Sequence, residues 1–143
     1  MENMEIWKYE KLKIGNLEPV LGGDICEFED LEIWQKAREI CRIVYETKKN
    51  SNLKNDFKLY NQLNGSSGSI MDNIAEGFER ETTKEFIRFL YISKASTGEC
   101  RSQLFLAYDL EYLEEKEFNE IKAGLEEISK LLSGLIKYLK STL

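Results

Sequence analysis

The chain has 143 residues and a formal net charge of −6 at pH 7, so its length suits one domain and its acidity argues against avid binding of nucleic acid. It contains no histidine, which excludes a Ser-His-Asp triad, an imidazole general base and di-iron sites built on Glu-x-x-His. Its cysteines, Cys26, Cys41 and Cys100, form no CxxC pair, and no long apolar run is present. We therefore expect a cytoplasmic protein with reduced thiols, no metal, no cofactor and no membrane association.

Residues 1–27 are predicted to form an irregular N-terminal arm, and residues 28–143 the folded domain. The arm holds the only proline of the chain, Pro19, which is typical of a turn or a helix boundary. It also contains ENMEIWK, residues 2–8, which is similar to EDLEIWQ, residues 29–35. One interpretation of this similarity is chance. The other is that the arm imitates the start of the first helix and docks on a neighbouring subunit.

Four amphipathic helices are predicted after the arm, because apolar residues recur there at steps of three and four and no proline interrupts them. They cover about residues 31–48, about 56–79, a segment that starts after Thr82 or Thr83, and about 115–138 or beyond. Asp30 is a plausible N-cap for the first of them. Since short polar links join the helices, we predict an all-α, antiparallel up-down four-helix bundle.

The second predicted helix contains an unfavourable stretch, NGSSGS, at residues 64–69. Its two glycines and three serines are poor helix formers, with a cost of roughly 1 kcal/mol for each glycine. On the residues alone, a continuous helix and a break at this point are equally compatible with the sequence.

Small and polar residues form a stripe on the second predicted helix, and a similar stripe runs along the third. The stripes consist of Ser66, Ser69, Asn73 and Gly77, and of Ser93, Ser96, Thr97 and Cys100. If these faces meet, the two helices approach closely, and Asn73 and Glu76 hydrogen-bond across the interface. Gly77 either ends its helix or lets a neighbouring backbone come near. The alternative is a binding site that uses Asn73, Glu76 and Glu99.

Three stretches of the sequence resemble the 23S rRNA intervening-sequence protein family, also called four helix bundle protein. They are FEDLEIWQKAREI (28–40), SIMDNIAEGFER (69–80) and KEFIRFLYISKAS (84–96). The resemblance implies a bundle that assembles into a homopentamer, carries no enzymatic activity and keeps residues 64–69 within a helix. It also gives Asn73, Glu76, Gly77 and Glu99 as motif positions.

The resemblance also implies a function in a nucleic-acid or ribonucleoprotein context. Members of this family occur as reading frames inside intervening sequences of bacterial large-subunit rRNA genes, so RNA is an expected partner. Related bundles act as accessory variability proteins of diversity-generating retroelements. The alternative function is therefore an accessory protein that binds a reverse transcriptase together with its RNA or cDNA.

Basic residues are concentrated in the middle of the chain, in two clusters. One surrounds the first connection, at Lys48, Lys49, Lys54 and Lys58. The other supplies the predicted nucleic-acid-binding residues, which are Arg80, Lys84, Arg88, Lys94 and Arg101. Arg80, Lys84 and Arg88 are four residues apart, as on one helical face. The alternative is that Lys84 and Arg88 pair with Glu81 and Glu85 on a solvated surface. We expect no interleaved aromatic residues of the kind that stack unpaired bases.

Two further predictions concern the surface. Phe89 and Ile92 fall off the main apolar stripe of the third helix, so we expect them to contribute to a subunit contact. An enzyme that holds a divalent cation with Asp72, Glu76 and Glu99 is a third hypothesis. No nucleophile or histidine accompanies these carboxylates, so we predict that the protein is not an enzyme.

Overall fold

The computed structural model describes residues 27–47, 49 and 51–143. The predicted N-terminal arm, except for Glu27, and the similarity of its residues 2–8 to the first helix lie outside the described residues. No helix among those that are described is both long and apolar enough to span a lipid bilayer.

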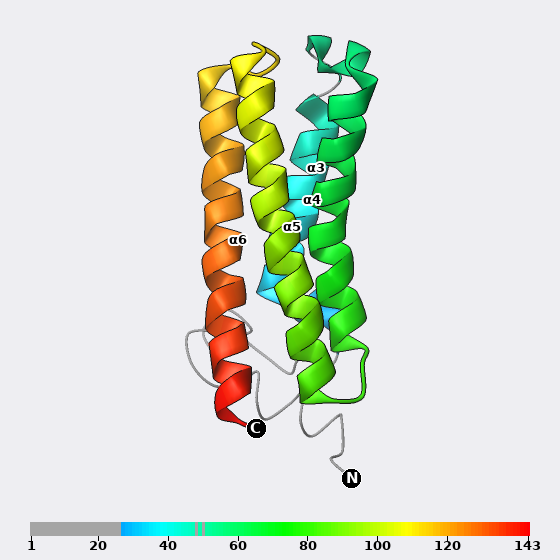
Figure 1. Cartoon of the computed structure of the whole chain (residues 1–143), viewed down its shortest axis with the longest axis vertical. Helices are drawn as coiled ribbons and strands as arrows, with labels where there is room; N and C mark the ends of the chain where they lie inside the picture. Colours follow the sequence, from blue (N-terminus) through cyan, green and yellow to red (C-terminus); the bar gives the residue numbers. More distant parts are fainter. Residues whose placement is uncertain (1–26, 48, 50) are drawn as a thin grey trace.

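Four long helices and two short 3-10 helices make up the described fold. In chain order they are η1 (Phe28–Asp30), α3 (Glu32–Thr47), η3 (Asn52–Asn55), α4 (Phe57–Phe78), α5 (Thr83–Asp109) and α6 (Glu115–Ser141). Consecutive long helices run antiparallel, with the α3–α4 and α5–α6 links at one end of the molecule and the α4–α5 link at the other (Figure 1). This arrangement confirms the predicted all-α four-helix bundle.

Polar side chains set the starts of two helices where the sequence predicts them. The Asp56 carboxylate accepts a hydrogen bond from the Leu59 amide at 3.1 Å, and the Thr82 hydroxyl accepts one from the Glu85 amide at 3.2 Å. The start of the first long helix differs from the prediction that Asp30 is its N-cap. The Asp30 carboxylate accepts from the Glu27 amide at 3.0 Å within η1, and α3 begins two residues later.

Helix α4 runs without a break through residues 64–69, as the family resemblance implies. Ser66 and Ser67 are buried, and their hydroxyls donate to the backbone carbonyls of Leu63 and Asn64 at 3.3 and 3.2 Å. The buried face of this stretch packs on the neighbouring helices. Packing of that face therefore outweighs the low helix propensity of the stretch.

The predicted apolar stripes form one continuous core. Every apolar residue of the predicted α6 stripe, from Phe118 to Leu139, is buried, and Phe78 and Phe86 meet edge to face with ring centroids 6.0 Å apart. Burial raises the pKa of the Cys100 thiol to about 11. This thiol therefore stays neutral at physiological pH and packs as a small apolar side chain.

The small-residue stripes of α4 and α5 meet, as predicted. The hydroxyls of Ser69 and Ser96 are 2.9 Å apart across the interface, and Ser93 donates to the carbonyl of Ile70 at 2.8 Å. The prediction that Asn73 hydrogen-bonds across the interface is wrong, because its amide donates within α4, to the Ser69 carbonyl at 2.8 Å and to the Ser69 hydroxyl at 2.9 Å. Asn73 therefore supports the contact only through Ser69. Hydroxyl groups thus replace large apolar side chains along the α4–α5 interface, and every one of these hydroxyls is hydrogen-bonded.

Gly77 lies inside α4 rather than beyond its end. A Cβ atom added there would lie 2.6 Å from the Cβ atom of Phe89 and 3.0 Å from Cδ1 of Phe86. Of the two predicted roles, the structure therefore supports the close approach of a neighbouring helix, because no side chain larger than hydrogen fits between α4 and α5 at this position.

Candidate nucleic-acid interface

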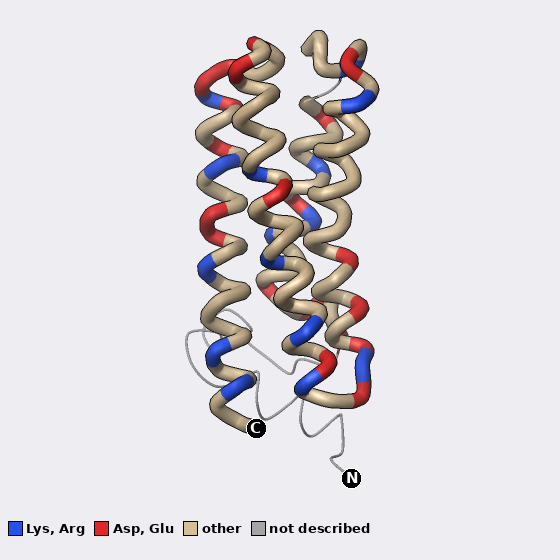
Figure 2. Tube along the Cα trace, in the orientation of Figure 1, with Lys and Arg blue, Asp and Glu red and all other residues tan. Residues whose placement is uncertain are grey.

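A surface groove between α5 and α6 gathers most of the basic side chains of these two helices. It consists of two adjoining hollows of about 280 and 500 Å³, which share Lys94 and Ser133 in their walls. Figure 2 shows basic positions along both helices on this side of the bundle. The residues that line this α5/α6 groove are Tyr91, Lys94, Arg101, Glu126, Ser129, Lys130, Ser133, Ile136, Lys137 and Lys140.

The groove keeps its positive charge because its cations have few acidic partners. Glu126 is the one carboxylate in its lining, and this side chain pairs with Lys122 at 3.7 Å. Lys94 and Lys140 donate to the neutral hydroxyls of Ser133 and Tyr91, respectively. Within the described part of the chain, the other cations of the groove have no carboxylate oxygen within 4.0 Å. Ammonium and guanidinium groups in this state are available to an anionic ligand.

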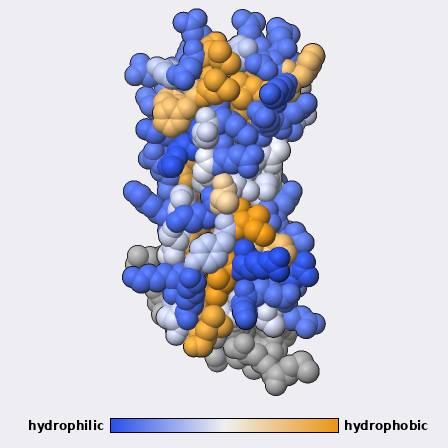
Figure 3. All heavy atoms as spheres, in the orientation of Figure 1, coloured by the Kyte–Doolittle hydropathy of each residue, from blue (hydrophilic) through white to orange (hydrophobic). Residues whose placement is uncertain are grey.

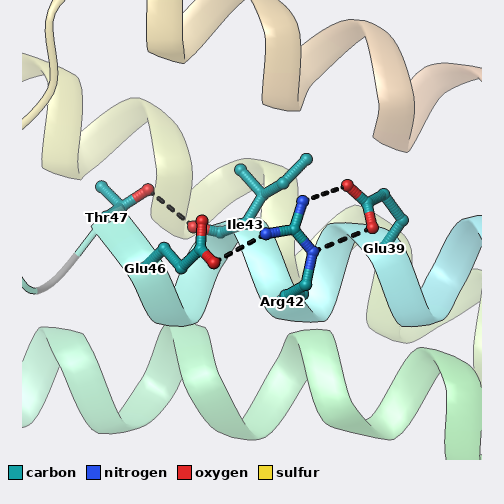
Figure 4. Close-up of polar contacts among 5 residues, drawn as sticks. All are labelled: Glu39, Arg42, Ile43, Glu46 and Thr47. Atoms are coloured by element: carbon teal, nitrogen blue, oxygen red, sulfur yellow. Dashed lines mark hydrogen bonds and ion pairs between the residues drawn. The ribbon is translucent and has the colours of Figure 1, made fainter.

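Two cations of α3, Lys36 and Arg42, differ, because carboxylates of the same chain already pair with them. The guanidinium of Arg42 donates two hydrogen bonds to Glu39 and one to Glu46 at 2.7 Å, and these contacts raise the pKa of Arg42 (Figure 4). Lys36 pairs with Glu127 of α6 at 2.7 Å and with Glu32 at 3.6 Å. This face of the bundle therefore offers little net positive charge to a ligand.

The basic cluster at the first connection is also balanced by acids. Lys49 and Lys54 line a hollow of about 410 Å³ together with Glu111, Glu114 and Glu117 from the end of α5 and the start of α6. Lys48 lies outside the described residues. In the folded protein, these glutamates therefore offset the positive charge of the lysines at the first connection.

The structure divides the five predicted nucleic-acid-binding residues into two sets. Lys94 and Arg101 line the α5/α6 groove, whereas Arg80, Lys84 and Arg88 do not. The prediction that these last three share one helical face is wrong, because α5 begins only at Thr83 and Arg80 belongs to the preceding turn.

The three residues outside the groove lie in two different environments. Arg80 pairs with Glu76 at 3.3 Å, and its guanidinium lies 4.8 Å from the ring centroid of Phe89. Lys84 and Arg88 are exposed on the first turns of α5. The alternative pairing of Lys84 and Arg88 with acidic neighbours is absent from the described residues at a 4.0 Å limit.

Sequence reasoning missed the three lysines that α6 contributes, Lys130, Lys137 and Lys140. A signal for two of them is present in the sequence. Lys130 and Lys137 are seven residues apart, and so are Lys94 and Arg101. Residues seven apart return to nearly the same side of a helix, so each pair marks one edge of the groove.

The remaining motif positions hold local contacts rather than a shared site. The carboxylate of Glu76, predicted to bond across the α4–α5 interface, instead points to Arg80, and that prediction is wrong. Glu99 accepts a hydrogen bond from Gln103 at 3.3 Å. Among the described residues, no three Asp, Glu, Cys or His side chains are grouped closely enough to hold a metal ion, so Asp72 does not form a cluster with these two glutamates.

The residues predicted to form a subunit contact lie on the surface of α5 to different degrees. Ile92 is 41% exposed, whereas Phe89 is half-buried beside Gly77. Leu106, near the end of α5, and Leu110, directly after it, are 48% and 46% exposed. Figure 3 shows apolar surface at the end of the bundle where α5 ends and again lower on the same face. The subunit contact itself stays a prediction.

Comparisons with known proteins agree with this architecture. The chain matches the family profile described as 23S rRNA-intervening sequence protein over residues 29–134. It is also similar to the crystal structure of a protein of unknown function from the S23 ribosomal protein family of Bacteroides thetaiotaomicron, with 30% sequence identity and a TM-score of 0.68 over 73% of this chain and 98% of that one. No curated protein matches the sequence. Since the family profile spans most of the chain, the protein belongs to the 23S rRNA intervening sequence protein family.

Proposed function

We propose that this protein is a non-enzymatic, homo-oligomeric scaffold that binds RNA through the α5/α6 groove. The observation that carries the proposal is the basic lining of this groove in a chain whose net charge is −6. The family name refers to an rRNA intervening sequence, which supports RNA as the class of ligand.

The chemistry of the groove suits a phosphate backbone. Lysine and arginine side chains neutralise phosphates, and the nearby hydroxyls of Ser129 and Ser133 supply neutral hydrogen-bond donors. Binding by such groups releases condensed counterions, so the affinity falls as the salt concentration rises. Because the rest of the chain carries a net negative charge, it attracts RNA less strongly than the groove does.

A homo-oligomer would carry one copy of the α5/α6 groove on each subunit. The family resemblance favours a pentamer, and the exposed apolar residues of α5, including Ile92 and Leu106, supply surface for a subunit contact. Several grooves in one assembly bind a single RNA molecule with a higher apparent affinity than one groove alone.

Native mass spectrometry of the freshly purified protein, before and after nuclease treatment, tests both parts of this proposal. We expect a mass of five 16.7 kDa chains, with additional mass that nuclease removes. A monomer would contradict the oligomeric scaffold, and a protein that stays free of nucleic acid even when RNA is added would contradict the RNA function. Additional mass that nuclease leaves in place would instead indicate a protein partner, such as the reverse transcriptase of the alternative function.

A further inference from the structure

We infer that the α5/α6 groove takes single-stranded nucleic acid, with an unpaired base stacked on the ring of Tyr91. The inference rests on the proposed function, because it assumes nucleic acid in this groove and specifies the form in which it binds. Tyr91 lines the groove among lysines, although the sequence led us to expect no aromatic residue interleaved with the basic ones.

The position of Tyr91 is the first reason. Tyr91 is 45% exposed and lines the smaller hollow of the groove together with Lys94 and Lys137. The cations close to Tyr91 in the sequence all belong to α5. In the folded protein, Lys137 and Lys140 of α6 line the same hollow as Tyr91. The ring therefore lies among positive charges that come from two helices.

Contacts with Lys140 hold the ring in place. The ammonium of Lys140 donates to the Tyr91 hydroxyl and lies 4.9 Å from the ring centroid. Ile136 lines the same hollow and is itself buried in the core. A partly exposed, oriented aromatic ring with cations around it matches the way in which proteins bind single strands, where bases stack on aromatic rings and the backbone follows a positive groove.

Single strands fit this arrangement better than duplexes. In a duplex the faces of the bases are already stacked on one another, so none is available to Tyr91, and the ring would contribute nothing to binding. In a single strand an unpaired base can lie on the ring while the phosphates on either side reach Lys94 and Lys137. Because every base has an aromatic face, we expect little sequence preference.

Fluorescence polarisation at about 0.1 M salt tests the inference with a labelled oligouridine of about 20 nucleotides and an RNA duplex of about the same length. We expect the wild-type protein to bind the single strand more tightly than the duplex. Tyr91→Ala should weaken binding of the single strand by roughly 10-fold and leave duplex binding unchanged, since it removes stacking but no charge. Tyr91→Phe keeps the ring and should retain the affinity for the single strand.

Tyr45 provides the matched control, because it is 51% exposed on α3 and lies outside the groove lining. Tyr45→Ala should leave both affinities unchanged. A 5-iodouracil-substituted strand should form its photochemical adduct with Tyr91, as identified by peptide mass spectrometry.

Three results would overturn the inference. They are equal binding of single strand and duplex, an unchanged single-strand affinity in Tyr91→Ala, and a changed oligomer mass in Tyr91→Ala, which would assign the ring to a subunit contact. In each of these cases salt-dependent RNA binding would leave the proposed function standing. If neither RNA binds in a salt-dependent manner, the proposed function itself fails.

Discussion

Replacing Gly77 with alanine is expected to lower the free energy of unfolding by about 2 kcal/mol. The added methyl group would lie 2.6 Å from Cβ of Phe89, an atom that is fixed to the α5 backbone and cannot rotate away. The methyl group would also lie 3.0 Å from Cδ1 of Phe86, so it cannot avoid Phe89 by shifting toward Phe86. The helices α4 and α5 must therefore separate locally, and overpacking of this kind typically costs 1–3 kcal/mol, or about 2 kcal/mol here.

The same substitution elsewhere in the bundle provides the control. Gly98 and Gly134 also lie inside long helices, but a Cβ atom added at either position would meet no atom within 4 Å. Gly98→Ala and Gly134→Ala should raise the free energy of unfolding by about 0.5–1 kcal/mol, because alanine favours the helix and restricts the unfolded chain. Urea denaturation followed by circular dichroism measures all three variants. Stabilisation of Gly77→Ala to the same extent would refute the close approach of α4 and α5.

Removing the three α6 lysines of the groove should weaken RNA binding by about 100-fold at about 0.1 M salt. Each lost phosphate contact lowers the dependence of log K on log salt by about 0.7 for a single strand, so the triple variant Lys130→Ala, Lys137→Ala, Lys140→Ala should reduce this slope by about 2. The difference from the wild type should shrink as the salt concentration approaches about 1 M. Polarisation titrations over a range of salt concentrations measure both quantities.

A second triple variant separates a local site from a general effect of net charge. Lys49→Ala, Lys54→Ala, Lys58→Ala removes the same amount of positive charge from the start of α4 and the link before it, at the end of the bundle where Glu111, Glu114 and Glu117 lie. This variant should bind RNA nearly as tightly as the wild type. Equal losses in the two triple variants would mean that the overall charge of the protein, and not the groove, controls the affinity.

The fold could be predicted from the sequence because the spacing of the apolar residues indicates both where the helices lie and which face of each helix is buried. The strict alternation from Phe118 to Leu139 predicts a helix with one buried face, and all of its apolar stripe residues are buried. The stretch at 64–69 is different, because its local propensity leaves the structure undecided. What decides it is contact with α5, for example between the hydroxyls of Ser69 and Ser96 at 2.9 Å, and such a contact is invisible to a local reading of the sequence.

The candidate site was harder to predict because it depends on which helices are neighbours. Lys94 and Arg101 belong to a basic cluster that the sequence shows directly, but Lys130 and Lys137 lie far from them along the chain and become relevant only when α6 packs beside α5. The sequence pattern is misleading at Arg80 for a local reason. Its spacing fits a helical face, but a turn of a few residues separates it from α5, and that short offset directs its side chain to Glu76.

Lysine footprinting tests the location of RNA binding most directly. The protein would be acetylated briefly with and without a saturating single-stranded RNA, and the acetylation of each lysine would be measured by peptide mass spectrometry. RNA in the α5/α6 groove should protect Lys130, Lys137 and Lys140, while Lys54 and Lys58, which lie outside the groove lining, react as before. Protection of Lys54 and Lys58, or no protection of the groove lysines when the RNA is bound, would contradict the account.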